Sequence, residues 1–206
     1  MFCSRNFRKM TDQLVTPIPG QPRDVSISMS RVNLLALPVA LITLLVCGTP
    51  FVLVHGWGAL AESARLFLRP GLAVPVLLIG FVLHELIHGA AWAFYGQKPL
   101  TIMRFGINWA ALAPYAHCPE PMEAGAYRLG ALAPGAILGL LPIAVAMWVG
   151  PTWVFFAGLL FSIAAAGDFM ILWVLRNVPS HFLVQDHPSR AGCLVYEPIS
   201  PEESHV

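Results

Sequence analysis

The stretch LAVPVLLIGFVLHELIHGAAWAFY, residues 72–95, places two histidines and a glutamate near the middle of a long apolar run. A helix of about 20 apolar residues crosses a hydrocarbon core of about 30 Å, so this stretch is long enough to span a membrane. Ionisable side chains inside such a helix are costly, and they gather at functional sites. His84, Glu85 and His88 therefore mark this segment as a candidate functional site as well as a span.

The composition of the whole chain also favours a membrane protein. Of its 206 residues, 57% are hydrophobic and only 11% are charged, whereas soluble domains carry about 25% charged residues. The mean hydropathy is +0.69, and we therefore expect the chain to lie in a lipid bilayer. A net charge of +1 offers no basic surface for a phosphate backbone, so nucleic acid is not an expected partner.

Three further apolar segments have the length of a membrane span: residues 32–54, 127–149 and 152–175. Together with residues 72–95 they predict an all-α polytopic membrane protein with four transmembrane helices. Residues 1–30 are polar and broken by prolines, which predicts a disordered N-terminal arm. Residues 31–176 then form the four-span membrane domain, and residues 177–206 form a C-terminal tail.

The distribution of Lys and Arg predicts how these spans are oriented. Ten of these residues stand before the first span, between the second and third, or after the fourth, whereas only Arg65 and Arg69 stand on the other side. Short loops rich in Lys and Arg stay in the cytoplasm. Both termini are therefore expected to be cytoplasmic.

The connection between the second and third spans, residues 96–126, is long and contains four prolines. By the same charge count it is cytoplasmic, and a loop of this length is usually functional. Within it, residues 100–110 contain spaced apolar residues around Gly106. This pattern favours short extended strands or a β-hairpin over a fifth helix.

The sequence His84-Glu85-Leu86-Ile87-His88 has the pattern H-E-x-x-H. On a helix, residues four apart share one face, so both imidazoles can reach one Zn²⁺ ion at about 2.0–2.1 Å. Glu85 is displaced from that face and is placed to act as a general base toward a zinc-bound water. The alternative is a buried hydrogen-bond network that only locks two helices together.

A catalytic zinc site usually has three protein ligands, and Asp168 in the fourth predicted span is the candidate for the third. A rise of about 1.5 Å per residue places His88 and Asp168 both about 24 Å from the outer ends of their spans. The small residues 164–167 and Gly80 allow the two backbones to approach closely. Alternatively, Asp168 is a lone acid that snorkels toward the cytoplasmic end with Arg176.

Other polar residues are weaker candidates for the same site. Five of them lie in the loop or the tail and could fold back over it: His117, Cys118, His181, Asp186 and His187. For each, an ordinary solvated or hydrogen-bonded role is expected. The four cysteines have neither zinc-site spacing nor disulfide density, so we expect free thiols. Gly135 and Gly139 in the third predicted span are explained by tight helix packing.

Four short motifs together resemble a known family: His84-Glu85-Leu86-Ile87-His88-Gly89, Pro114-Tyr115-Ala116-His117-Cys118, Gly167-Asp168 and Asp186-His187-Pro188. Over about residues 70–198, the chain resembles a bacterial family of membrane zincin metallopeptidases. More distantly it is similar to the site-two proteases, in which an HExxH helix and an aspartate from a later span hold zinc.

One feature departs from those distant relatives. Their aspartate stands in a Leu-Asp-Gly context, whereas here Gly167 precedes Asp168 and Phe169 follows it. Asp186 and His187 therefore remain alternatives for the third ligand. The resemblance also implies an integral protein of the bacterial inner (plasma) membrane, and a substrate strand that pairs with the segment after the HExxH span.

The leading hypothesis is a zinc-dependent intramembrane or membrane-proximal metallopeptidase that cleaves a membrane protein or peptide. In this hypothesis Glu85 is catalytic, and His84, His88 and Asp168 bind Zn²⁺. Two other hypotheses stay open: a non-catalytic metal-binding membrane protein, and an inactive relative that acts as a membrane scaffold. The intact glutamate in the motif favours hydrolysis.

Overall fold

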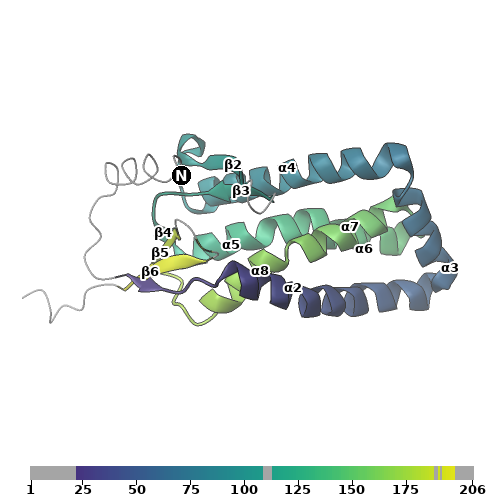
Figure 1. Ribbon diagram of the computed structural model, residues 1–206, viewed down its shortest axis with the longest axis horizontal. Helices are drawn as coiled ribbons and strands as arrows, with labels where there is room; N and C mark the ends of the chain where they lie inside the picture. Colours follow the sequence, from purple (N-terminus) through teal and green to yellow (C-terminus); the bar gives the residue numbers. More distant parts are fainter. Residues whose placement is uncertain (1–21, 109–112, 188–189, 191, 198–206) are drawn as a thin grey trace, which may run out of the picture.

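The computed structural model describes residues 22–108, 113–187, 190 and 192–197. Long helices run along the molecule, and small β-strands gather at one end of it (Figure 1). The described helices are α2 (Met29–Thr43), α3 (Thr49–Phe67), α4 (Pro70–Tyr95), α5 (Ala124–Pro134), α6 (Leu141–Val149), α7 (Trp153–Ala164) and α8 (Ala166–Leu175). The fold is thus mostly helical, as the sequence predicts.

Two π-helical turns join consecutive helices. η1 (Leu44–Gly48) joins α2 to α3, and η3 (Gly135–Leu140) joins α5 to α6. Each turn comes just before a proline, Pro50 or Pro142, in the first turn of the next helix. Proline lacks an N–H donor and its ring clashes with the carbonyl four residues earlier. A wider helical turn at this point relieves that clash, so the chain continues as a helix.

Three helical segments are long and apolar enough to cross a membrane: Leu34–Phe67, Pro70–Tyr95 and Ala124–Val149. The predicted spans over residues 72–95 and 127–149 are therefore present as helices. α7 and α8 make a fourth span if the two are counted together, but they are bent by 45° relative to each other. The span predicted over residues 152–175 is therefore built from two helices, because the chain leaves helical geometry at Ala165.

The first predicted span, residues 32–54, is also helical, and the helix is kinked two residues beyond its predicted end. α3 runs to Phe67, but Gly56 within it has non-helical backbone angles. Its φ of +84° is a conformation that side chains other than glycine rarely adopt. The chain turns there, and the remainder of α3 leads across the end of the bundle toward the start of α4 (Figure 1).

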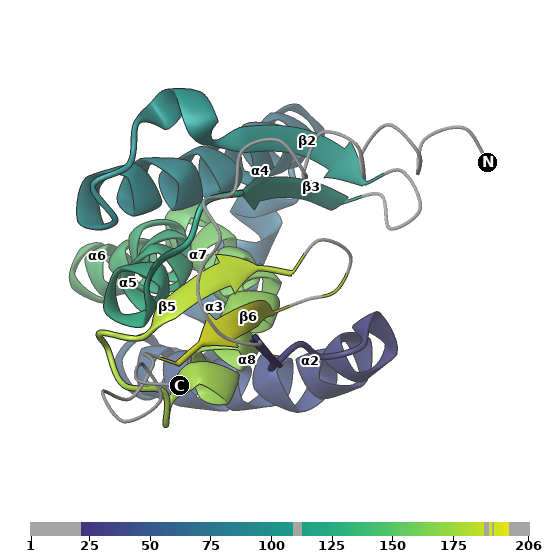
Figure 2. The ribbon, with the colours of Figure 1, turned by 90° about the vertical axis from the view of Figure 1, so that its left-hand side faces the viewer.

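The helices form a layered bundle, in which α4 and α2 lie on opposite sides of the α5 to α8 group (Figures 1 and 2). α4 packs on α5, whereas α2 packs on α7 and α8. Small residues make these contacts close: a Cβ on Gly139 would lie 2.3 Å from Ser162 Oγ, and one on Gly80 would lie 1.9 Å from the Phe161 ring. The small-residue packing predicted for the third span is therefore confirmed.

A four-stranded antiparallel sheet closes one end of the bundle. Its strand order is β1 (Arg23–Asp24), β6 (Cys193–Tyr196), β5 (Leu183–Asp186) and β4 (Met122–Glu123). The prediction of an all-α fold with a plain tail missed this sheet. Most of the predicted N-terminal arm, residues 1–21, lies outside the described residues, and its end forms β1. The sheet covers a core of Met122, Tyr127, Leu175, Val184, Cys193 and Val195.

The predicted hairpin in the loop after α4 is present. It is built from β2 (Arg104–Asn108) and β3 (Ala113–His117), with a short 3₁₀ turn, η2 (Leu100–Ile102), before it. The hairpin lies over the end of α4 that carries the histidines (Figure 2). Gly89 of α4 permits this, because a Cβ there would lie 2.4 Å from the Phe105 ring. The hairpin therefore borders the face that carries the HExxH motif.

Candidate metal centre

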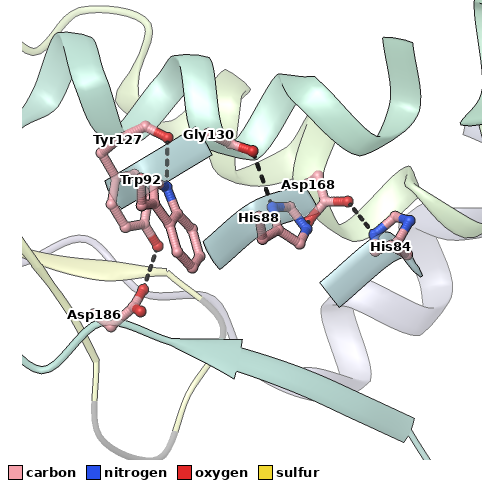
Figure 3. Close-up of polar contacts among 7 residues, drawn as sticks. All are labelled: His84, His88, Trp92, Tyr127, Gly130, Asp168 and Asp186. Carbon is pink, nitrogen blue, oxygen red and sulfur yellow. Dashed lines mark hydrogen bonds and ion pairs between the residues drawn. The ribbon is translucent and has the colours of Figure 1, made fainter. Parts of the chain in front are cut away.

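α4 presents the two histidines of the motif to the interior of the bundle. His84 and His88 are both buried, and their ring centroids are 4.9 Å apart at an angle of 77°. This is the spacing expected of residues one turn apart on a helix. Both rings point toward α8, where Asp168 lies (Figure 3).

The bend at Ala165 places Asp168 in the first turn of α8. There the positive end of the helix dipole favours a carboxylate. Its two oxygens contact the two imidazoles: His84 Nε2 lies 3.1 Å from Oδ2, and His88 Nε2 lies 3.2 Å from Oδ1. Because this carboxylate touches both rings, the alternative of a lone acid paired with Arg176 was wrong.

The end of α8 is fastened to α5, which carries the remaining partner of the site. Arg128 of α5 donates from Nη1 to the carbonyl oxygens of Leu175, at 3.0 Å, and Val178, at 2.9 Å. Two residues further along α5, the Gly130 carbonyl accepts a hydrogen bond of 2.9 Å from His88 Nδ1. The position of Asp168 and the orientation of His88 therefore depend on the same helix.

The hydrogen bond to Gly130 decides which atom of His88 is available to an ion. With the proton on Nδ1, a neutral imidazole presents the bare lone pair of Nε2 to the Asp168 carboxylate. Two acceptors at 3.2 Å repel each other unless a proton or a cation lies between them. Metal-bound histidines commonly have this arrangement, with the second ring nitrogen donating to a carbonyl.

The donor atoms also fit the size of a zinc site. The candidate ligand atoms of His84, His88 and Asp168 all lie within 4.8 Å of one another. Around a tetrahedral zinc ion at about 2.0–2.1 Å, ligand atoms are about 3.3 Å apart, close to the 3.1 and 3.2 Å between the imidazoles and the Asp168 carboxylate. Nδ1 of His84 is buried with no hydrogen-bond partner among the described residues, so this ring is held by α4 and by its contact with Asp168.

Glu85 faces a different neighbour. Its half-buried carboxylate lies next to the backbone of Ala116 in β3. It therefore lies between the histidine face of α4 and the hairpin. The group predicted as a general base is thus next to the predicted metal ligands without belonging to their set.

A stack of aromatic rings continues from His88, and the sequence analysis missed it. The Trp92 ring lies parallel to the imidazole with centroids 5.2 Å apart, and Tyr127 stacks on Trp92 at 5.3 Å, both at 19°. Trp92 Nε1 donates to the Tyr127 carbonyl at 3.1 Å, and the Tyr127 hydroxyl donates to Asp186 (Figure 3). The spacing of His84, His88 and Trp92, four residues apart on one helix face, was the available signal.

The weaker candidates do not join the histidines. Asp186 contacts His117 and the backbone N–H of Cys118, and His187 lies 3.9 Å from Asp24, so neither is the third member of the cluster. His181 is exposed. Three cysteines of the described residues are free thiols: Cys47, Cys118 and Cys193. Cys3 lies outside the described residues.

Comparison with known proteins assigns the chain to a family. No curated protein and no solved structure matches the chain. A family model described as "Putative zincin peptidase" matches residues 77–183. This region begins within α4, contains the motif, the hairpin and Asp168, and covers more than half of the chain. The chain therefore belongs to this family of zincin peptidases.

Proposed function

We propose that this protein is a zinc-dependent peptidase that works within or next to a membrane. The observation that carries the proposal is the convergence of His84 Nε2 and His88 Nε2 on the single carboxylate of Asp168, at 3.1 and 3.2 Å. Membership of the zincin peptidase family supports zinc as the ion. The apolar helices support a membrane setting.

His84, His88 and Asp168 would hold the ion through two imidazole nitrogens and a carboxylate. Zinc bound there would acidify a water molecule and polarise the carbonyl of the bond to be cleaved. Glu85 takes the proton from the attacking water and returns it to the nitrogen of the leaving amine. Burial excludes bulk water from the two histidines and strengthens the electrostatic contacts around them.

The outer edge of β3 supports a peptide as the substrate. Among the described strands β3 pairs with β2 alone, and its residue Ala116 lies next to Glu85. An extended segment that pairs with this edge would place its backbone beside the base. Membrane proteins or peptides with a locally unwound segment are therefore the proposed substrates.

The depth of the site indicates where cleavage would occur. His88 and Asp168 each stand seven residues before the ends of α4 and α8 nearest the β-strands. At about 1.5 Å per residue this is about 10 Å from the end of each helix. We place the cut in the leaflet on the strand side, and propose that this side is the cytoplasm of a bacterium with the protein in its plasma membrane.

The substitution Glu85→Gln separates hydrolysis from metal binding. We expect the purified variant to keep bound zinc, measured by elemental analysis, and to lose cleavage of casein and of a mixture of quenched fluorescent peptides. Glu62→Gln is the matched control, because Glu62 lies on the far end of the bundle in an exposed pair with Arg65. Retained cleavage by Glu85→Gln would exclude this role, and wild-type protein that binds zinc but cleaves nothing would favour a non-catalytic metal protein.

A further inference from the structure

Asp186 stands at the end of β5, beyond the region that the family model matches. Its side chain is only 11% exposed and interacts with three separate groups. The carboxylate accepts hydrogen bonds from the Tyr127 hydroxyl and, at 2.9 Å, from the Cys118 N–H. Nδ1 of His117 lies 3.3 Å away. One largely buried carboxylate therefore joins the C-terminal sheet to both α5 and the end of β3.

The contact with α5 leads to the metal centre through packed rings. Tyr127 stacks on Trp92, and Trp92 stacks on His88. The Trp92 ring also fills the space over Gly130, where a Cβ would lie 2.0 Å from it, and the Gly130 carbonyl orients His88. In close-packed interiors such rings cannot shift independently. The position of Tyr127 therefore constrains the imidazole two rings away.

The contact with β3 leads to the proposed base. His117 and Cys118 follow directly after Ala116, whose backbone lies next to the Glu85 carboxylate. Anchoring the end of the strand on Asp186 fixes the position of Ala116 beside Glu85. Without a carboxylate at position 186, the hydroxyl of Tyr127 and the N–H of Cys118 would compete for fewer acceptors, and a buried donor without an acceptor is destabilising.

We propose that Asp186 is a positioning residue for this centre: it holds the His88 imidazole through Tyr127 and Trp92, and holds Glu85 through the end of β3. The inference rests on the proposed zinc site, and it assigns to the C-terminal sheet a part in metal binding. A purely structural role would instead stabilise the sheet and leave the zinc affinity of the folded protein unchanged.

Zinc affinity of the folded protein tests the first arm of the proposal, in which Asp186 holds the His88 imidazole through Tyr127 and Trp92. We compare wild type, Asp186→Asn, Tyr127→Phe and the double variant by competition with a chelator in detergent. Loss of a partner behind a metal ligand typically costs 10- to 100-fold in affinity, and we expect about tenfold for each single variant. Because both act through one contact, the double variant should also lose about tenfold rather than about a hundredfold.

The control is Asp24→Asn, which removes a carboxylate from the same sheet at β1, where it contacts Ser26 and Arg190. It should bind zinc as wild type does. Thermal unfolding of the zinc-free proteins shows that each variant is folded. Wild-type affinity in Asp186→Asn, an equal loss in Asp24→Asn, or additive losses in the double variant would each overturn the first arm. Wild type that binds no zinc would instead overturn the proposed function.

Cleavage of casein at saturating zinc tests the second arm of the proposal, in which Asp186 holds Glu85 through the end of β3. Tyr127→Phe removes only the hydrogen bond that ties the ring stack to Asp186. Its kcat should therefore return to the wild-type value once zinc saturates the site. Asp186→Asn also loosens the end of β3 beside Glu85, and its kcat should stay several-fold lower with KM changed less. Equal kcat values for the two variants would remove the second arm and leave the first.

Discussion

Trp92 of α4 packs directly against Gly130 of α5, and the orientation of His88 depends on this contact. The indole occupies the position that a side chain at residue 130 would need, while the carbonyl of the same glycine accepts the His88 N–H. A glycine is therefore required at this position for its size rather than for backbone flexibility. The same residue supplies both the space for the ring and the acceptor for the ligand.

At the residue scale, Gly130→Ala should lower both stability and zinc affinity. The new Cβ would lie 2.0 Å from Trp92 Cδ1, and overpacking of this kind costs about 1–3 kcal/mol. Displacing the Gly130 carbonyl should weaken zinc binding about tenfold. Thermal unfolding and chelator competition measure the two effects. Gly167→Ala is the control, because a Cβ beside Asp168 would meet nothing within 4 Å; wild-type behaviour of Gly130→Ala would refute this packing argument.

At the scale of elements, the C-terminal sheet buries two thiols against the end of the bundle. Cys118 follows β3 and Cys193 begins β6, and both are almost fully buried. Burial raises the pKa of the Cys118 thiol to about 11 and that of Cys193 to about 12. The folded protein therefore favours the neutral thiols more strongly than the unfolded chain does.

This difference predicts a loss of stability at alkaline pH. Unfolded thiols ionise near pH 8.5, so their contribution is complete below that pH and falls as the pH rises toward the folded values of about 11 and 12. The melting temperature of the metal-free protein should therefore drop between about pH 8.5 and 11. The double variant Cys118→Ala, Cys193→Ala should start lower and drop less; an equal slope in both proteins would contradict the prediction.

At the scale of the whole molecule, charge is distributed unequally between the two ends of the bundle. Among the described residues, seven basic side chains lie in or next to the strands, or in the helix turns nearest to them: Arg23, Arg31, Lys98, Arg104, Arg128, Arg176 and Arg190. The opposite end, where α3 leads into α4, carries Arg65 and Arg69. Segments rich in Lys and Arg stay on the cytoplasmic side. The pairing of β1 with β6 brings the first and last described strands to the same end.

Reporter fusions in a bacterial host test this orientation. Alkaline phosphatase, which folds only outside the cytoplasm, should be inactive when fused after Val206 and active when inserted between Gly150 and Pro151. Green fluorescent protein should show the opposite pattern. A phosphatase active at the C-terminus would reverse the proposed topology and would place the candidate site on the other side of the membrane.

The sequence by itself determined the elements that depend on local pattern. Apolar length fixed the existence of the helices over 72–95 and 127–149, and helical periodicity alone put His84 and His88 on one face. His88 and Asp168 lie at equal distances from the outer ends of two spans that run in the same direction. This was enough to predict that Asp168 lies at the level of the histidines. The hairpin after α4 followed from spaced apolar residues around a glycine.

Only the tertiary structure decided the features that join distant parts of the chain. The C-terminal sheet pairs β1 with β6, and such pairing depends on neighbours that no local window contains. The bend at Ala165 comes in an alanine-rich stretch without a proline to signal it. The orientation of His88 depends on a carbonyl 42 residues away, because a buried imidazole takes whichever acceptor the packing of two helices places beside it.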